Sequence, residues 1–425
     1  MEKGVEIMAE QKLTRGEKNW ILYDVANSAF IMLVSTTIPI FFRSLAEGEG
    51  LSPEQATGVW GTVTSAAVLI LAVLSPILGA VADYKGMKKK MFLTSLLLGI
   101  AGLLAMSFAG EWVAFLVLFV IARVGYSASN IFYDSMLTDV TTDEKMDMVS
   151  SHGFAWGYIG SCIPFIIGIV LIFTTPFGLT TQTATQLSFL VTAVWWFGLT
   201  IPLLKTYRQT YYLEGKPERI RDIFHQLGDT FQKIRKNKQL LFYILAYFCY
   251  IDGVNTIISM STSYGDEMGI SSSAMIFALL LTQFIAFPCA IISGKLAKKH
   301  GALKMIKIFI VCYIAICIFG FQLDQAWEFW VLAVAVGLCQ GGIQALSRSY
   351  YGKLIPKEAS NEYFGFFDIF GKFADFFGPL IISFCAFVFH SSSYGVLALI
   401  FLFGLGLFLV FQSERAARRA APRRR

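Results

Sequence analysis

Long apolar segments dominate this chain, and they restrict its fold more than any other feature. A hydrocarbon core of about 30 Å requires roughly 20 consecutive apolar residues in a helix. The composition is 56% apolar with 39 Phe and only 15% charged residues, more apolar than a soluble domain of this length needs. We predict twelve membrane-spanning helices, at residues 19–42, 57–82, 91–110, 113–138, 149–174, 185–204, 240–263, 272–297, 303–322, 328–350, 363–389 and 392–411. The expected fold class is therefore an all-α integral membrane protein.

One long polar stretch separates the sixth predicted helix from the seventh. It runs from Lys205 to Lys238, is rich in Lys and Arg, and contains Gly215 and Pro217. The sequence therefore predicts two pseudo-symmetric six-helix halves, at residues 1–204 and 239–412, joined by a linker at 205–238 and followed by a basic tail at 413–425.

The positions of Lys and Arg predict the orientation in the membrane, because cytoplasmic loops are enriched in these residues. They gather in the N-terminal segment, in alternate loops, in the linker and in the tail, as Lys3, Lys12, Arg15, Lys18, Lys85, Lys88, Lys89, Lys90, Lys298, Lys299, Lys304, Lys353, Lys357 and the residues from Arg415 on. We therefore expect a plasma membrane protein with both termini and the linker in the cytoplasm. The basic tail could also touch anionic membrane lipids.

A polar pattern occurs once in each half. Asp24, Asn27 and Ser28 stand at i, i+3 and i+4 in the first predicted helix, and Asp252 and Asn255, followed by a threonine, repeat the spacing in the seventh. Residues at this spacing share one face of a helix. We expect both carboxylates to face a common cavity. Asp252 should lie nearer the membrane midplane, where its titration could couple transport to protons.

A glycine pattern is also repeated. The end of the second helix reads Gly79-x3-Asp83-x2-Gly86-x-Lys88, and residues 294–301, at the end of the eighth, keep the glycine spacing with a lysine in place of the aspartate. Glycine permits close approach and charges flank the helix end. This group is therefore expected to form a cytoplasmic gate.

These residues resemble known transporters. The glycine pattern is similar to the loop signature of the major facilitator superfamily, and Arg123 resembles the arginine in the fourth helix of that superfamily, although the glycine expected shortly after it is displaced to Gly125. A narrower resemblance, to the autophagy-related vacuolar effluxer family and its bacterial relatives, rests on residues 23–30, 150–161, 252–256, 341–349 and 362–379. It implies alternating access between two halves, and export of amino acids or other small metabolites.

Charged residues inside the predicted helices are the remaining site candidates, because an intramembrane charge is costly unless it faces a cavity or a partner. They are Asp24, Arg123, Asp252, Asp368, Lys372 and Asp375. The last three share one face of the eleventh helix and could form either a substrate or proton site or a structural ion pair. Asp24 and Asn27 could instead be hydrogen-bonding contacts between helices, and Arg123 could brace its own helix.

The function expected from these features is secondary active transport of a small solute, with proton coupling as one option. A flippase for lipids or amphiphiles is the alternative, which the Phe-rich eleventh helix would suit. Zinc, nucleotide-loop and hydrolase motifs do not occur in the sequence, so we expect no enzyme activity, no cofactor and no metal. The seven cysteines are scattered singly and are expected to be buried small side chains. We expect a monomer that does not bind nucleic acid.

Overall fold

The computed structural model describes residues 12–215, 220–267, 269–323, 325–389 and 393–420. The helices of the first half are α2 (Arg15–Ser35), α3 (Thr37–Gly48), α4 (Pro53–Ala82), α5 (Met87–Met106), α6 (Trp112–Val140), α7 (Asp143–Thr174), η1 (Pro176–Gly178) and α8 (Thr181–Thr206). They are followed by α9 (Ile220–Lys236), α10 (Lys238–Glu267), α11 (Ser272–His300), α12 (Ala302–Phe321), α13 (Ala326–Leu354), η2 (Lys357–Ala359), α14 (Ser360–Phe389) and α15 (Ser393–Ala420).

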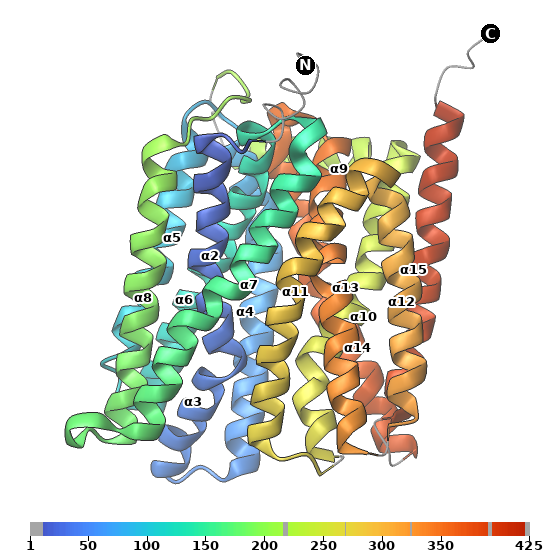
Figure 1. The fold of residues 1–425 in the computed structure, drawn as a ribbon. Coiled ribbons are helices and arrows are strands. Elements are labelled where there is room, and N and C mark those ends of the chain that lie inside the picture. Colours follow the sequence, from blue (N-terminus) through green and yellow to red (C-terminus); the bar gives the residue numbers. More distant parts are fainter. Residues whose placement is uncertain (1–11, 216–219, 268, 324, 390–392, 421–425) are drawn as a thin grey trace, which may run out of the picture.

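The described chain forms a bundle of long, nearly parallel helices (Figure 1). Twelve helical segments among the described residues are long and apolar enough to cross a membrane, as the sequence predicts. Helix α2 begins and α15 ends at the same end of the bundle (Figure 1). We call this the terminus-side end.

The first membrane segment is broken, where the sequence predicts one helix at residues 19–42. Helix α2 ends at Ser35, Thr36 leaves helical geometry with φ −132° and ψ −73°, and α3 follows at once. Pro39 has no N–H to donate to the carbonyl of Ser35, four residues earlier, so the helical hydrogen-bond ladder is interrupted here.

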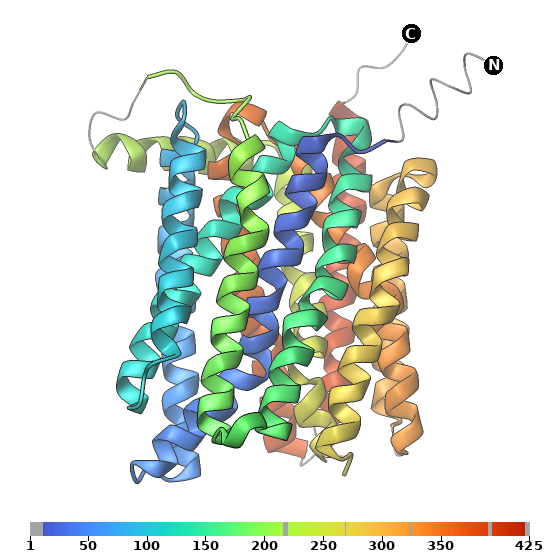
Figure 2. The same ribbon diagram turned by 60° about the vertical axis from the view of Figure 1, so that its left-hand side comes forward.

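The linker also contains a helix that the sequence analysis does not predict. Helix α9 runs across the bundle near its terminus-side end, rather than along it (Figure 2). Ile223, Thr230 and Ile234 are buried. Their spacing at i, i+7 and i+11 places them on one face, which explains why a segment this rich in charge is helical.

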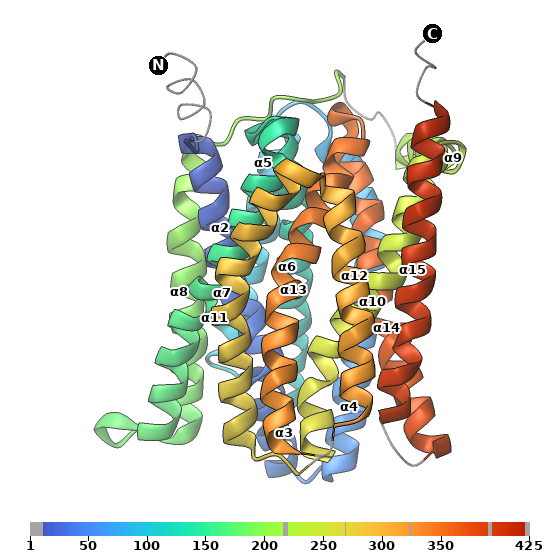
Figure 3. The ribbon, with the colours of Figure 1, turned by 45° about the vertical axis from the view of Figure 1, so that its right-hand side comes forward.

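Buried apolar side chains form two large clusters. One is built from α2 to α8, and the other from α10 to α15 with Ile131 of α6 and Ile234 of α9. Between the clusters, α4 packs against α14 and α7 packs against α11. The two groups of helices can be followed side by side in Figure 3. The polar residues that matter for function lie where these groups meet.

Candidate functional site

A polar cavity of about 410 Å³ lies between the two groups of helices. Helices α2, α6 and α7 form one wall, and α10, α11 and α13 form the other. Its charged and amide side chains are Asp24, Asn27, Asn130, Asp134, Asn255, Gln283, Gln340, Gln344 and Arg348. Asp24, Asn27 and Asn255 are therefore the sequence candidates that the structure brings to this cavity.

Arg348 is the central charge of the cavity, and it extends from α13 into the first half. Its Nη2 lies 3.2 Å from Asp24 Oδ2 and its Nη1 lies 3.0 Å from Asp134 Oδ1. Its Nε donates to Ser150 Oγ at 3.0 Å, and Nη2 also donates to the Ser150 carbonyl at 3.2 Å. The guanidinium of one half is thus held by two carboxylates and a backbone carbonyl of the other.

Aromatic rings enclose the same guanidinium. The Arg348 Cζ atom lies 4.7 Å from the ring centre of Trp20, 5.5 Å from that of Tyr133 and 4.3 Å from that of Phe154. Only 5% of the arginine is exposed. A planar cation between aromatic faces gains cation–π attraction, which is stronger where water is excluded. With both carboxylates ionised, this cluster holds two negative charges against one positive charge.

Amide and hydroxyl side chains make up the remaining polar lining. Asn27 donates to Asn130 at 3.0 Å within the first half, and Tyr158 donates to Gln344 of the second half at 2.7 Å. An amide side chain both donates and accepts hydrogen bonds. The lining therefore suits a small polar solute, with charges of either sign near the Arg348 cluster.

Asp252 is not among the residues that line this cavity. Its carboxylate is fully buried between α10 and α14, where Oδ1 accepts a hydrogen bond from the Gly378 N–H at 2.9 Å. A Cβ at Gly378 would lie 1.8 Å from Thr256 Oγ1, so the glycine is what allows the two helices to approach this closely. This placement corrects the expectation that both repeated carboxylates face one cavity.

Arg123, Asp368 and Lys372 are also not among the residues that line the cavity. Arg123 is partly buried on α6, and its Nη1 has no hydrogen-bond partner among the described residues. Asp368 pairs with Lys372 on α14 and accepts a hydrogen bond from Ser75 of α4 at 2.6 Å. This pair therefore lies at the contact between the halves. The side chain of Asp375 falls outside the described residues.

The expected gate residues lie at the terminus-side end, against the first turn of α14. Asp83 Oδ1 accepts from the Asn361 N–H at 2.8 Å, and its Oδ2 accepts from the Glu362 N–H at 2.9 Å. A carboxylate from the first half thus satisfies free N–H groups at the start of a second-half helix, as a capping residue would. Burial raises the pKa of Asp83 to about 7, although Lys88 and these N–H groups act in the opposite direction.

The neighbouring residues of the motif explain how the contact is made so closely. A Cβ at Gly79 would lie 2.4 Å from the Asn361 carbonyl oxygen, so only glycine fits there. Gly86 has a φ of 73°, a left-handed conformation that favours glycine. Lys88 is fully buried, pairs with Asp139 at 2.7 Å and donates to Ser360 Oγ of the second half at 3.1 Å.

Further polar contacts join the halves near the same end. Ser349 donates to Asp147 at 2.7 Å, Lys353 also pairs with Asp147 at 2.7 Å, and Lys357 pairs with Asp143 at 3.0 Å. Together with the Asp83 contacts, they hold the terminus-side end closed beneath the cavity.

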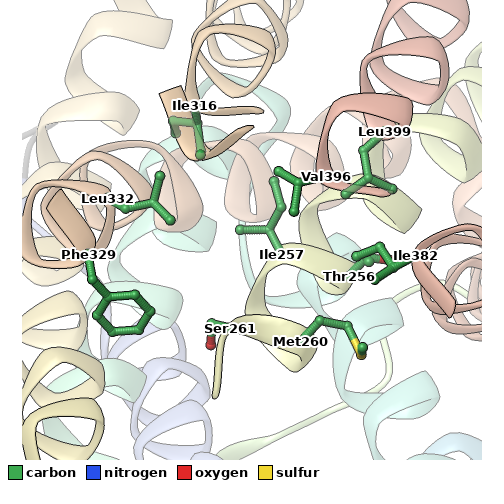
Figure 4. Close-up of a pocket in the computed structure, with 11 residues that line it drawn as sticks. Thr256, Ile257, Met260, Ser261, Ile316, Phe329, Leu332, Ile382, Val396 and Leu399 are labelled. Atoms are coloured by element: carbon green, nitrogen blue, oxygen red, sulfur yellow. The ribbon is translucent and has the colours of Figure 1, made fainter. Parts of the chain in front are cut away.

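A second cavity, of about 50 Å³, lies within the second half (Figure 4). It is enclosed by aliphatic side chains such as Ile257, Ile316 and Leu399, with Phe329 at one side. It offers few groups to a polar solute and little room. The described residues contain no cluster of His, Cys, Asp and Glu suited to a metal ion. The central cavity is therefore the better candidate for a solute site.

Two charged residues of the site, and the amides other than Asn27 and Asn255, are not among the residues that the sequence analysis predicts. Asp134 and Arg348 stand within a few residues of the predicted ends of their helices, at residues 138 and 350, where a charge can reach the headgroups at little cost. The available signal was a charge within an apolar segment, the same signal that identified Asp24.

Comparisons with known proteins agree with this architecture. Residues 14–421 match the family model described as vacuole effluxer Atg22 like. The Bacillus subtilis (strain 168) protein YxiO, described as an uncharacterized MFS-type transporter, is 43% identical over 408 residues, covering 94% of this chain and 95% of YxiO.

Two solved structures share the fold. The human organic anion transporter MFSD10 (TETRAN) has a TM-score of 0.72 at 14% identity, with 93% of this chain and 99% of that one covered. The major facilitator superfamily transporter FucP, solved in the outward conformation, has a TM-score of 0.70 at 15% identity, with 94% and 97% covered.

Proposed function

We propose that this chain, which belongs to the Atg22-like vacuole effluxer family and is an MFS-type transporter, carries a small polar solute through the central cavity by alternating access. The observation that supports this proposal best is the position of Arg348. One guanidinium lines the cavity and also joins the halves, so binding of a solute and movement of the halves involve the same charges.

We propose that the terminus-side end faces the cytoplasm. The lysines of the closed end, including Lys88, Lys353 and Lys357, belong to the basic loops that usually remain cytoplasmic. The structure would then correspond to a state closed toward the cytoplasm. Secondary transporters of this kind bind the solute near the midplane between repeats, and the central cavity lies between the two halves.

The Arg348 cluster indicates how closure could be released. An arginine stays protonated in proteins, so when it leaves Asp24 and Asp134 these carboxylates lose their paired positive charge unless another group neutralises them. A cationic group of the solute or a proton would do so. An anionic group would instead bind the guanidinium from the cavity side. Each route weakens the contact between the halves, as alternating access requires. We therefore propose a proton as the ion that is coupled to movement of the solute.

The alternative of a lipid flippase gains no support from the Phe-rich helix α14. Phe377, Phe384 and Phe387 are exposed and are not among the residues that line the central cavity. Amides and charges dominate the polar part of that cavity. The geometry therefore favours a polar solute over an acyl chain.

The proposal is tested by screening the purified protein against amines, amino acids, carboxylic acids and sugars for thermal stabilisation, followed by counterflow in proteoliposomes. Arg348→Lys keeps the charge but cannot donate to both carboxylates and to Ser150 at once, so we expect roughly tenfold weaker solute binding and slower counterflow. Glu47→Gln, at an exposed position on α3, is the matched control. Unchanged binding and counterflow in a folded Arg348→Lys variant would refute the role of the cluster.

A further inference from the structure

Helix α9 presents a face that the transport proposal does not use. Phe224 and Phe231, seven residues apart and therefore on one face of the helix, are 56% and 54% exposed. Arg221 precedes the first by three residues and Arg235 follows the second by four, so both arginines flank the two rings. This exposed face combines aromatic and cationic side chains.

The charges of α9 are divided between its faces. Asp222 and Asp229 are also seven residues apart, and at 3.6 residues per turn they lie on the side of the helix opposite the two rings. The aromatic face thus carries only positive charge nearby. An exposed apolar stripe flanked by Arg, with acidic residues turned away, is typical of helices that lie in the interface of an anionic bilayer.

The orientation of the helix fits this partner. Helix α9 lies across the bundle at the level of the terminus-side helix ends and extends beyond the neighbouring helices (Figure 2). A helix in that position runs parallel to the membrane surface. Its exposed rings can then enter the interface, while the arginines reach lipid phosphates.

The side of α9 that faces away from the two rings contacts the closed end. Gln226 donates to Glu362 Oε2 at 2.7 Å, and the Tyr84 hydroxyl donates to Gln226 Oε1 at 3.2 Å. Tyr84 follows Asp83 in the chain, and the Glu362 N–H donates to Asp83 Oδ2. One glutamine therefore bridges the two halves beside the Asp83 contact.

We propose that α9 binds the surface of an anionic phospholipid bilayer through Phe224, Phe231, Arg221 and Arg235, and that this docking stabilises the closed terminus-side end through Gln226. The docking itself is independent of the transport proposal. Its effect on closure rests on the proposed transport cycle, so the two parts need separate measurements.

Docking is measured with an environment-sensitive fluorophore on Phe224→Cys, in a background without the native cysteines and in nanodiscs of phosphatidylcholine with or without phosphatidylglycerol. We expect a blue-shifted emission and quenching by spin-labelled lipid when phosphatidylglycerol is present. The same fluorophore on Asp229→Cys, on the opposite face, should stay water-exposed. Arg221→Gln with Arg235→Gln should lower the ratio of docked to undocked helix by roughly 30-fold.

Equal water exposure at positions 224 and 229 in both lipids would overturn the docking, and equal docking in both lipids would overturn the anionic partner. Hydrogen exchange of α9 in the unmodified protein is a second measurement if the cysteine-free background does not fold, and it should slow with phosphatidylglycerol. Gln226→Ala should keep the docking signal but remove the effect of phosphatidylglycerol on closure. Closure that still responds to lipid in this variant would refute the coupling alone.

Discussion

The buried Asp83 carboxylate predicts that acid stabilises the closed terminus-side end. Burial raises its pKa to about 7 in the closed state. When the halves separate at this end, the carboxyl group enters water and should titrate near the ordinary aspartate value of about 3.9. The closed state therefore binds a proton more tightly than the open state. The stabilisation of the closed state by this proton is fully present below the open-state pKa of Asp83, and it is lost as the pH rises through about 7.

The size of the effect follows from these two values. At pH 6 the higher affinity of the closed state for a proton favours closure about 11-fold, whereas at pH 8 the factor is about 1.1. Lowering the pH from 8 to 6 should thus raise the ratio of closed to open molecules roughly tenfold, or by about 1.4 kcal/mol. Lys88, Tyr84 and Glu362 surround Asp83, so a variant at Asp83 itself is needed to isolate its contribution.

The ratio can be measured by distances between spin labels on Lys90→Cys and Glu358→Cys, which are exposed positions on opposite halves near the closed end. The closed-state distance should gain population at pH 6, and Asp83→Asn should abolish the pH dependence. Asp83→Ala should in addition slow transport with little effect on solute affinity, because the contact lies away from the cavity. A pH dependence that survives Asp83→Asn, or that has the opposite sign, would refute the reasoning.

Two further predictions concern close packing. Gly79→Val should prevent closure, because a Cβ there would lie 2.4 Å from the Asn361 carbonyl oxygen. Gly58→Val in the same helix has open space and serves as the control. The spin-label distances measure closure in both variants, and a closed population retained by Gly79→Val would contradict the packing argument. Asp252→Ala should lower the free energy of unfolding by about 1–3 kcal/mol through loss of the contact with Gly378. It should leave solute affinity unchanged, and a selective loss of binding with normal thermal stability would contradict this.

The membrane helices and one cavity carboxylate could be predicted because both follow from the free-energy cost of placing a short segment of chain in the membrane. An apolar run of about 20 residues is long enough to cross the hydrocarbon core, and an acid such as Asp24 in the middle of one requires a partner. Arg348 was harder to identify because a charge near a helix end can reach the membrane surface at little free-energy cost. Only the packing of α13 against the first half shows that the guanidinium is buried between Trp20 and Phe154.

Asp252 shows why an internal repeat does not fix a role. Its spacing to Asn255 copies that of Asp24 to Asn27, but the helix facing it carries Gly378, which lets α10 and α14 approach until the carboxylate meets a backbone N–H. The neighbour, and not the repeated segment, decides where the side chain lies. The helix in the linker was missed for a related reason, since the apolar positions of α9 are few and only their period reveals them.

Two groups of carboxylates join the halves through different electrostatic contacts. Asp24 and Asp134 hold Arg348 through their negative charges, so Asp24→Asn or Asp134→Asn should weaken the joining of the halves from the cavity side. A proton on Asp83 relieves the cost of a buried charge, and so strengthens closure from the terminus-side end. Acid at the terminus-side end should therefore preserve the closed state, whereas loss of a negative charge beside the cavity should release it.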